Sequence, residues 1–290
     1  MNKTIGFKAV RSLGDILYDN DKRTFSVSHR KALSIHMPSS HFHSTYEIYY
    51  LLAGKRDIFI KDRTIVIEAG DIVIIPPNIL HRTTNAKIPE HERLIVNIHE
   101  KEMIPAKNSS PDILQPLFEK EYILIRSSQL DQVSIQTLAQ QIILEMREAK
   151  PGFEMYALTL TLQFLIICCR HVKQNSPEPP VFPSPMHERI SEIVRYINDH
   201  YSEKLSLHLL AEKFYVSPYY LSRCFKEATG FTFVEYLNSI RVKEAKKLLV
   251  HSSLKVNLIA KKVGFGSVTH FGRVFKQVTG HAPLFYKMDK

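Results

Sequence analysis

An internal repeat in the last third of the chain constrains its fold more than any other feature. Residues 217–230, SPYYLSRCFKEATG, align with residues 267–280, SVTHFGRVFKQVTG, at a constant offset of 50 positions. Each copy begins with a serine suited to cap a helix and ends with a glycine suited to the left-handed C-terminal conformation. Each copy is therefore predicted to be a helix, and a shorter predicted helix, LHLLAEKF or LIAKKV, precedes it across a tight turn.

A helix, a tight turn and a capped second helix form a helix-turn-helix, whose second helix enters the major groove of DNA. Two copies imply two adjacent grooves, and we call the helices within 217–230 and 267–280 the reader helices. Between them, Thr232 and Glu235 are predicted to form a capping box that opens a linking helix running to about Val250. On the solvated side of this linking helix we expect four basic side chains: Arg241, Lys243, Lys246 and Lys247.

The net charge of +10 is concentrated in the same third of the chain. Residues 187–290 contain 17 Lys and Arg against 9 Asp and Glu, a net charge of +8. Such an excess indicates a polyanionic partner, and without a basic amphipathic anchor nucleic acid is favoured over a membrane. The N-terminus shows no apolar signal segment, and the 3 cysteines form no disulfide framework. We therefore expect a cytoplasmic protein with reduced thiols and no membrane partner.

The chain divides at a proline-rich stretch. Residues 174–186 hold five of the 15 prolines and show neither helical nor strand periodicity, which is typical of an extended linker. Residues 24–100 contain short β-rich runs that predict an all-β unit, whereas two apolar-periodic segments after Pro111 predict helices. The expected domains are a β domain over 1–110, a helical dimerisation or packing segment over 111–173, a linker over 174–187 and a helix-turn-helix domain over 188–290.

The last hundred residues resemble the DNA-binding domain of AraC/XylS-type bacterial transcription regulators. The segments that carry the resemblance are AEKFYVSPYYLSRCFKEATGF from Ala211, RVKEAKKLL from Arg241 and IAKKVGFGSVTHFGRVFKQVTGHAP from Ile259. The resemblance implies a ligand-responsive regulator, an activator, that binds double-stranded DNA as a homodimer and has RNA polymerase as a further partner. The alternative, a helical bundle that binds no DNA, requires the repeat, the caps and the charge to agree by accident.

Helical spacing separates the core positions of the reader helices from those that face a groove. Leu221 and Phe225 of the first copy, and Phe271 and Phe275 of the second, are expected in the core. Arginine can donate two hydrogen bonds to guanine, whereas the lysines are expected at phosphates or, as the alternative, in solvent. By resemblance to the family, the groove-facing positions are Tyr219, Ser222 and Arg223 in the first copy and Val268, Thr269, Gly272 and Arg273 in the second; Lys226 and Lys276 are the lysines expected at phosphates.

Two spaced motifs in the β-rich part resemble those of cupins. The first, H-x-H-x3-E-x6-G, runs from His41 to Gly54, and the second runs from Gly70 to Asn85 with Asn78 where the family usually has glycine. Because asparagine tolerates a left-handed backbone, this departure leaves the fold expectation unchanged. The expected fold is multidomain α+β: a cupin-like β-barrel (jelly roll) with C-terminal helices, then an all-α domain of two helix-turn-helix units joined by a linking helix.

Strand alternation gathers polar side chains of the first motif on one side of a strand. In metal-dependent cupins the matching positions are ligands, so one hypothesis is a divalent metal at His41, His43, Glu47 and His81, as in a metalloenzyme or a metal-ion sensor. In sensor domains fused to AraC-type DNA-binding domains, the resemblance implies instead a small-molecule effector, frequently a sugar. We expect this second use, with no enzyme activity, no catalytic residue and no required cofactor; the effector-binding residues are then His41, His43, Glu47, Tyr49 and His81.

A helix expected over residues 154–172 offers a route from sensor to DNA. Its apolar face follows roughly coiled-coil spacing: Leu158, Leu162, Leu165 and Cys169. One hypothesis is that this face pairs two subunits. Effector binding then changes the dimer or releases the N-terminal arm, residues 1–20, so that both DNA-binding domains engage neighbouring half-sites. The alternative is that the same face packs on its own β domain.

Overall fold

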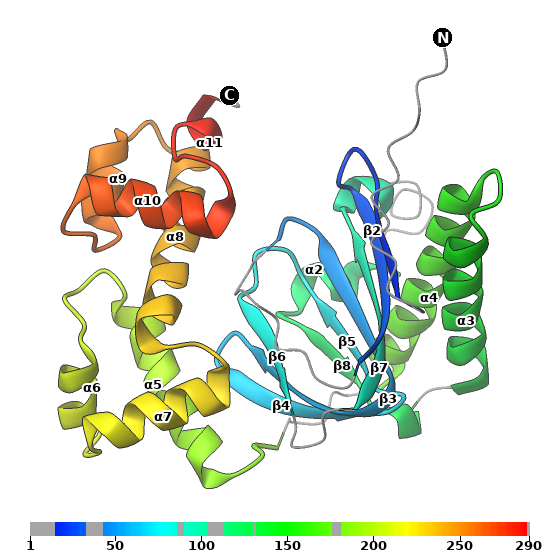
Figure 1. Cartoon of the computed structure of the whole chain (residues 1–290), viewed down its shortest axis with the longest axis horizontal. Coiled ribbons are helices and arrows are strands. Elements are labelled where there is room, and N and C mark those ends of the chain that lie inside the picture. The colour runs from blue at the N-terminus through cyan, green and yellow to red at the C-terminus, as the bar shows by residue number, and fades with distance from the viewer. Residues whose placement is uncertain are drawn as a thin grey trace.

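The computed structural model describes residues 15–32, 43–85, 90–103, 113–129, 132–175 and 181–288. Within these residues the chain forms an N-terminal antiparallel β domain, covered on one side by helices, and a C-terminal group of helices (Figure 1). The two parts lie side by side. Strand β4 (Arg63–Glu68) contacts helices α5 (Pro185–His200) and α7 (Pro218–Thr229), so the β domain and the C-terminal helices meet directly.

The β domain is one folded antiparallel sheet. Its path runs β1-β2-β7-β3-β5-β8, and β4 and β6 both pair with the C-terminal half of β3. A register shift between Leu51 and Ala53 lets the long β3 serve both halves of the sheet. The path ends at β1 and β8, so the sheet is open in the part of the chain described. The remaining strand bounds are Ile16–Asp19 (β1), Phe25–Ala32 (β2), Tyr46–Ile60 (β3), Ile72–Ile75 (β5), His81–Asn85 (β6), His91–Ile98 (β7) and Ile123–Ile125 (β8).

Strand alternation gives this sheet two different faces. The outer face, which includes Ile48 and Tyr50, packs against α3 (Gln132–Glu148) and α4 (Phe153–Gln174). The opposite face, which we call the interior face, carries a separate apolar cluster: Tyr49, Leu51, Ile58, Ile60, Ile65, Ile67, Val73, Ile75 and Ile95. Because side chains alternate along a strand, Glu47 lies on the interior face together with Tyr49.

The face of α4 that was considered for pairing two subunits packs on its own β domain. Leu165 and Cys169 are buried in the core beneath the outer face, and Leu158 and Leu162 are partly buried against the same core. The contacts therefore support the alternative interpretation of this helix. By length and composition α4 could also cross a membrane, a property it shares with core helices of globular domains.

The C-terminal helices reproduce the predicted repeat. One helix-turn-helix consists of α6 (Leu207–Lys213) and α7, and the other consists of α9 (Val256–Lys262) and α10 (Val268–Thr279). Between them runs the linking helix α8 (Phe233–His251), which holds the two units apart (Figure 1). The short α11 (Phe285–Met288) follows the second unit.

The predicted helix caps are present. Ser217 and Ser267 each accept a hydrogen bond from the backbone amide three residues later, at 3.2 and 3.4 Å. Gly230 and Gly280 end the two reader helices in the left-handed conformation, with φ of 76° and 80°. The capping box that opens α8 is also formed. The local signals of the repeat therefore give the correct helix boundaries.

The prediction that α8 has a solvated basic side is mostly wrong. Of the four basic side chains, only Lys247 is exposed. Arg241 instead donates from Nε to the carbonyl oxygen of Tyr201 at 2.8 Å. Lys246 lies over the ring of Tyr286, 5.1 Å from its centre. Burial lowers the pKa of Arg241, Lys243 and Lys246. These side chains therefore tie α8 to its neighbours.

Several elements lie outside the sequence expectations. Strand β8 pairs with β5, within a segment for which only helices are expected. Its alternating sequence YILI was a usable signal. The short α2 (Gln115–Glu119) precedes it. Helix α5 begins at Pro185, inside the expected linker, because proline fits the first turn of a helix.

Candidate DNA interface and effector site

The reader helices α7 and α10 each bury one face and expose the other. Leu221, Phe225, Phe271 and Phe275 are buried, as helical spacing predicts. The opposite face carries the expected DNA-binding positions: Tyr219, Ser222, Arg223, Lys226, Val268, Thr269, Arg273 and Lys276 are exposed, and Gly272 is half-buried.

The positive charges on these exposed faces are available to a polyanion. Arg223 and Lys226 of the first unit, and Arg273 and Lys276 of the second, form no ion pair within the described ranges. Since each unit places one arginine and one lysine at the same helical positions, both units have the side chains needed to contact bases and phosphates.

A buried polar cluster lies on the interior face of the β domain. It consists of His43 just before β3, Glu47 on β3 and His81 at the start of β6. His43 Nε2 lies 3.2 Å from Glu47 Oε2, and His81 Nε2 lies 3.6 Å from the same oxygen. Glu47 and His81 are each 2% exposed. Three of the four metal ligands predicted from the sequence therefore lie together, and the fourth, His41, lies outside the described residues.

Backbone carbonyl groups orient both imidazole rings of this cluster. Nδ1 of His43 donates to the carbonyl oxygen of Thr45 at 2.8 Å, and Nδ1 of His81 donates to that of Ile79 at 2.9 Å. Because a carbonyl oxygen can only accept, Nδ1 carries the proton and each Nε2 is directed at Glu47.

The second motif also holds the first through its backbone. Asn78 has a φ of 61°, so the asparagine takes the left-handed conformation as expected. Its amide donates to the carbonyl oxygen of His43 at 2.8 Å. Replacing the usual glycine by asparagine therefore leaves the turn in place.

The cluster is electrostatically polarised. Burial opposes the ionisation of Glu47, but His81 and His43 outweigh it and hold the pKa of this carboxyl well below its ordinary value. Burial likewise opposes protonation of His81, yet Glu47 raises the pKa of this imidazole overall. A carboxylate beside a protonated imidazole is therefore the favoured state of the cluster.

The donor set also fits a divalent metal ion. One ligand atom each from His43, Glu47 and His81 lies within 4.8 Å of the others. Two imidazole nitrogens and a carboxylate suit a transition-metal ion with open coordination positions. Glu47 Oε1 is buried without a hydrogen-bond partner in the described part of the chain, so this carboxylate has capacity for a further ligand.

The interior face holds two arginines that sequence reasoning missed. Arg56 alternates with Ile58 along β3, and Arg93 precedes Ile95 by two residues on β7, so both belong to this face. The period-two pattern was a usable signal for both positions. The two positions were missed because arginine on a strand usually indicates the solvated side of the sheet.

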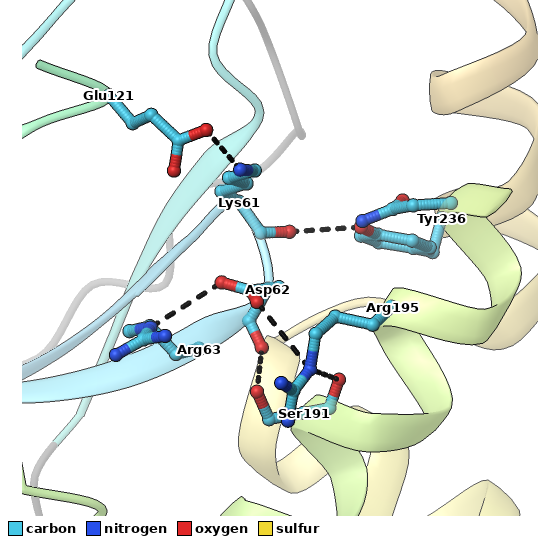
Figure 2. Close-up of polar contacts among 8 residues, drawn as sticks. Lys61, Asp62, Arg63, Glu121, Ser191, Arg195 and Tyr236 are labelled. Carbon is cyan, nitrogen blue, oxygen red and sulfur yellow. Dashed lines mark hydrogen bonds and ion pairs between the residues drawn. The ribbon is translucent and has the colours of Figure 1, made fainter.

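The turn between β3 and β4 contacts the DNA-binding part (Figure 2). Ser191 Oγ donates to the carbonyl oxygen of Asp62 at 2.5 Å, and the hydroxyl of Tyr236 lies 3.0 Å from the carbonyl oxygen of Lys61. Arg195 Nε lies 3.7 Å from Asp62 Oδ2. Helices α5 and α8 thus bind the backbone of this turn through side-chain hydrogen bonds.

The same contact continues to the end of the first reader helix. Thr64 Oγ1 donates to the carbonyl oxygen of Ala228 at 2.5 Å. The ring of Phe59 meets those of Phe231 and Tyr236, with centroid separations of 6.0 and 5.9 Å. A Cβ atom added to Gly230 would lie 2.8 Å from side-chain atoms of the β domain, so the helix end approaches the sheet closely.

A β domain with a buried polar cluster, joined to two helix-turn-helix units with exposed basic side chains, is the architecture expected of a ligand-binding regulator that acts on DNA. The comparisons with known families agree with this description. Residues 30–165 match the family model "AraC-like ligand binding domain", and residues 210–288 match a "Helix-turn-helix domain" model. The chain is a member of the AraC family of ligand-responsive, DNA-binding transcription regulators.

Two of the curated relatives match different shares of the chain. An uncharacterised HTH-type transcriptional regulator of Bacillus subtilis, YisR, is 26% identical over 251 residues, covering 84% of this chain and 86% of YisR. The HTH-type transcriptional activator RhaS of an Enterobacter species is 29% identical over 161 residues, 52% of this chain and 54% of RhaS. The structure of ToxT from Vibrio cholerae covers 92% of this chain and 98% of ToxT at 17% identity and a TM-score of 0.38.

Proposed function

We propose that this regulator is an activator of genes for the uptake or metabolism of a small hydroxylated molecule, and that this molecule binds at the interior polar cluster. The observation that supports the proposal most directly is the burial of Glu47 and His81 together, with Tyr49 on the same face. Carboxylate, imidazole and phenol groups can together accept from and donate to several hydroxyl groups, as a carbohydrate requires. The name of RhaS, an activator, favours activation.

On the DNA side, we propose that α7 and α10 read two adjacent major grooves. Arg223 and Arg273 would contact guanine, and Lys226 and Lys276 would contact phosphates. A cytoplasmic location follows from this role, and RNA polymerase is the expected partner at the promoter. The support is the exposure of these side chains at matching positions of the two capped helices.

We infer that the two functions are coupled through the turn between β3 and β4. This turn touches α5, the end of α7 and the start of α8, so it bears on the first helix-turn-helix and on the linking helix at once. β3 carries Glu47 near one end and this turn at the other. A shift of β3 on ligand binding would therefore reach the first reader helix through one continuous strand.

A second candidate function is metal-ion sensing. The favouring observation is that Glu47 Oε2 faces the Nε2 atoms of both His43 and His81. A bound divalent ion would replace the attraction between the carboxylate and the imidazoles, and it would require both imidazoles to be neutral.

The experiment starts from the full chain and a random pool of duplex DNA. Rounds of binding and amplification should yield one operator with two motifs about 10 base pairs apart. A thermal-shift screen against sugars and divalent metals then separates the two candidates, because a ligand that binds only the folded state raises the melting temperature. If no DNA sequence is enriched, the proposed role as a sequence-specific regulator is rejected. A shift by metal alone, lost in Glu47→Gln, would replace the small-molecule effector by a metal ion.

A further inference from the structure

Two arginine side chains are buried on the interior face of the β domain. Arg56 is 1% exposed and Arg93 is 8% exposed. Arginine is almost never buried to this extent without a partner of opposite charge, because the guanidinium loses its hydration. For Arg93 in particular, this burial in a domain that binds a ligand calls for a counter-ion.

Arg93 has no carboxylate partner in the part of the chain that the structure describes. Among the residues that the structure describes, Arg93 forms no ion pair, and its Nε is buried without a hydrogen-bond partner. Its guanidinium carbon lies 5.8 Å from the centre of the Tyr49 ring. The Tyr49 hydroxyl is also buried, and its polar neighbour is Arg93 itself, so its own proton is still free to be donated to a ligand. Two hydrogen-bond donors of one neighbourhood are thus available to an acceptor.

Arg56 adds a second positive charge to this neighbourhood. Its guanidinium contacts both ring nitrogens of His91, with Nη2 lying 2.8 Å from Nε2. Burial lowers the pKa of Arg56, and the positive charge of Arg93 contributes in the same direction. The two arginines are therefore close enough to repel each other, which a shared anion would relieve.

Glu47, the buried acidic side chain of the polar cluster on the interior face, is already engaged elsewhere. Glu47 faces His43 and His81, at 3.2 and 3.6 Å. Because Glu47 already faces these two imidazoles, it does not serve as the counter-ion of Arg93.

We propose that the effector carries a carboxylate, which Arg93 and the Tyr49 hydroxyl bind while Arg56 supplies further positive charge. The proposal rests on the proposed function, since it names the chemical class of the ligand for the same interior face. A guanidinium fork matches a planar carboxylate with two parallel hydrogen bonds. Apolar side chains cover much of the rest of this face. A singly charged carboxylate on a small carbon skeleton therefore fits better than a phosphate, whose additional charge must also be desolvated.

The first test measures the unliganded full chain, in buffer free of carboxylate and phosphate ions. Arg93→Met removes the buried charge but keeps an apolar side chain, so the melting temperature should rise by about 3 °C. Arg30→Met is the matched control, because Arg30 stands opposite Arg93 in the pairing of β2 with β7 and has Asp15 as its partner at 3.1 Å. Arg30→Met should leave the melting temperature unchanged or lower it. An Arg93→Met protein that melts below Arg30→Met overturns the proposal.

The second test compares acids with their neutral amides on the same protein: glucuronate with glucuronamide, hexanoate with hexanamide, and benzoate with benzamide. At least one acid should raise the melting temperature of the wild-type chain by about 5 °C at saturation, while its amide does not. Arg30→Met should keep this shift and Arg93→Met should lose it. An amide as effective as its acid, a shift retained by Arg93→Met, or no shift from any of the acids overturns the proposal.

A further variant, Tyr49→Phe, tests the same contact independently, in case Arg93→Met does not fold. Tyr49→Phe removes a single hydroxyl, so it should fold, melt no lower than the wild type without ligand and lose most of the shift caused by the acid. A full shift in Tyr49→Phe counts against the proposed contact. DNA selection reports separately on the regulator: a chain that enriches an operator but ignores every acid loses only the carboxylate proposal, whereas a chain that binds an acid and no DNA loses only the proposed function.

Discussion

The repeat supplies its own control for the contact between sensor and DNA-binding domain. Gly230 and Gly280 occupy equivalent positions at the ends of α7 and α10, and both have a positive φ. A Cβ atom at Gly230 would lie 2.8 Å from Arg82 Cδ and from Thr84 Cγ2, whereas a Cβ atom at Gly280 would meet nothing within 4 Å. Alanine at either position incurs the same backbone strain, but only Gly230→Ala adds a clash with the β domain.

The magnitudes follow from this difference. The left-handed conformation costs alanine about 1 kcal/mol at each position. Overpacking at Gly230 adds about 1 to 3 kcal/mol, since both Arg82 and Thr84 must move. Gly230→Ala should therefore destabilise the chain by about 2 to 4 kcal/mol and Gly280→Ala by about 1 kcal/mol. The excess for Gly230→Ala measures the contact between the two domains.

The assay is denaturant unfolding of both variants, combined with hydrogen exchange on the folded protein. Gly230→Ala should raise exchange at the turn between β3 and β4, which lies in the other domain, whereas Gly280→Ala should leave this turn protected. Equal destabilisation by the two substitutions, with unchanged hydrogen exchange at the turn between β3 and β4, would refute the inference that the domains are held together at this helix end.

Three further predictions concern single side chains. Thr64→Val removes the bond to Ala228 and should destabilise the chain by about 1 kcal/mol. Thr64→Val should also raise hydrogen exchange at the end of α7. Thr161→Val, which breaks a similar buried hydrogen bond inside α4, should destabilise the chain as much but leave exchange at the end of α7 unchanged. A similar increase in exchange at this helix end in both variants would contradict the prediction. Arg223→Ala should weaken binding to the selected operator by about 5- to 150-fold and relax one base preference in a mobility-shift titration. Equal loss on every sequence would assign Arg223 to phosphate. The Glu47–His81 pair stabilises the fold below a pH of about 6.5 and loses this contribution as the pH rises through the raised pKa of His81. With a chelator present, His81→Gln should therefore lower the melting temperature more at pH 6 than at pH 9, and an equal decrease at both values contradicts the pairing.

The DNA-binding half was predictable because its signals are local. Serine caps, the left-handed Gly230 and Gly280 and the capping box each depend on a few neighbouring residues, and the 50-residue repeat states them twice. The buried positions of α7 and α10 followed from helical spacing alone. By contrast, the environment of Arg241 depends on the packing of α8 against the end of α5, which no local pattern records.

The candidate site was predictable only in part. Motif spacing brought His43, Glu47 and His81 together across the folded sheet, although Glu47 pairs with Ile75 of β5 and His81 pairs with Ile60 at the other end of β3. Arg56 and Arg93 were missed since their charge suggested solvent, and only the three-dimensional sheet shows that they share a buried face. The turn at Asp62 was missed for a different reason: its partners are more than 120 residues away, at Ser191 and beyond.

Whether this regulator reads DNA through both copies of its repeat is tested most directly on the selected operator. Binding should be measured for the wild type, Arg223→Ala and Arg273→Ala against operators in which each base pair is changed in turn. We predict that the two substitutions relax base preference at different positions, separated by about 10 base pairs, one helical turn of DNA. Loss of preference at the same position for both variants, or at no position for Arg273→Ala, would contradict reading by two adjacent helix-turn-helix units.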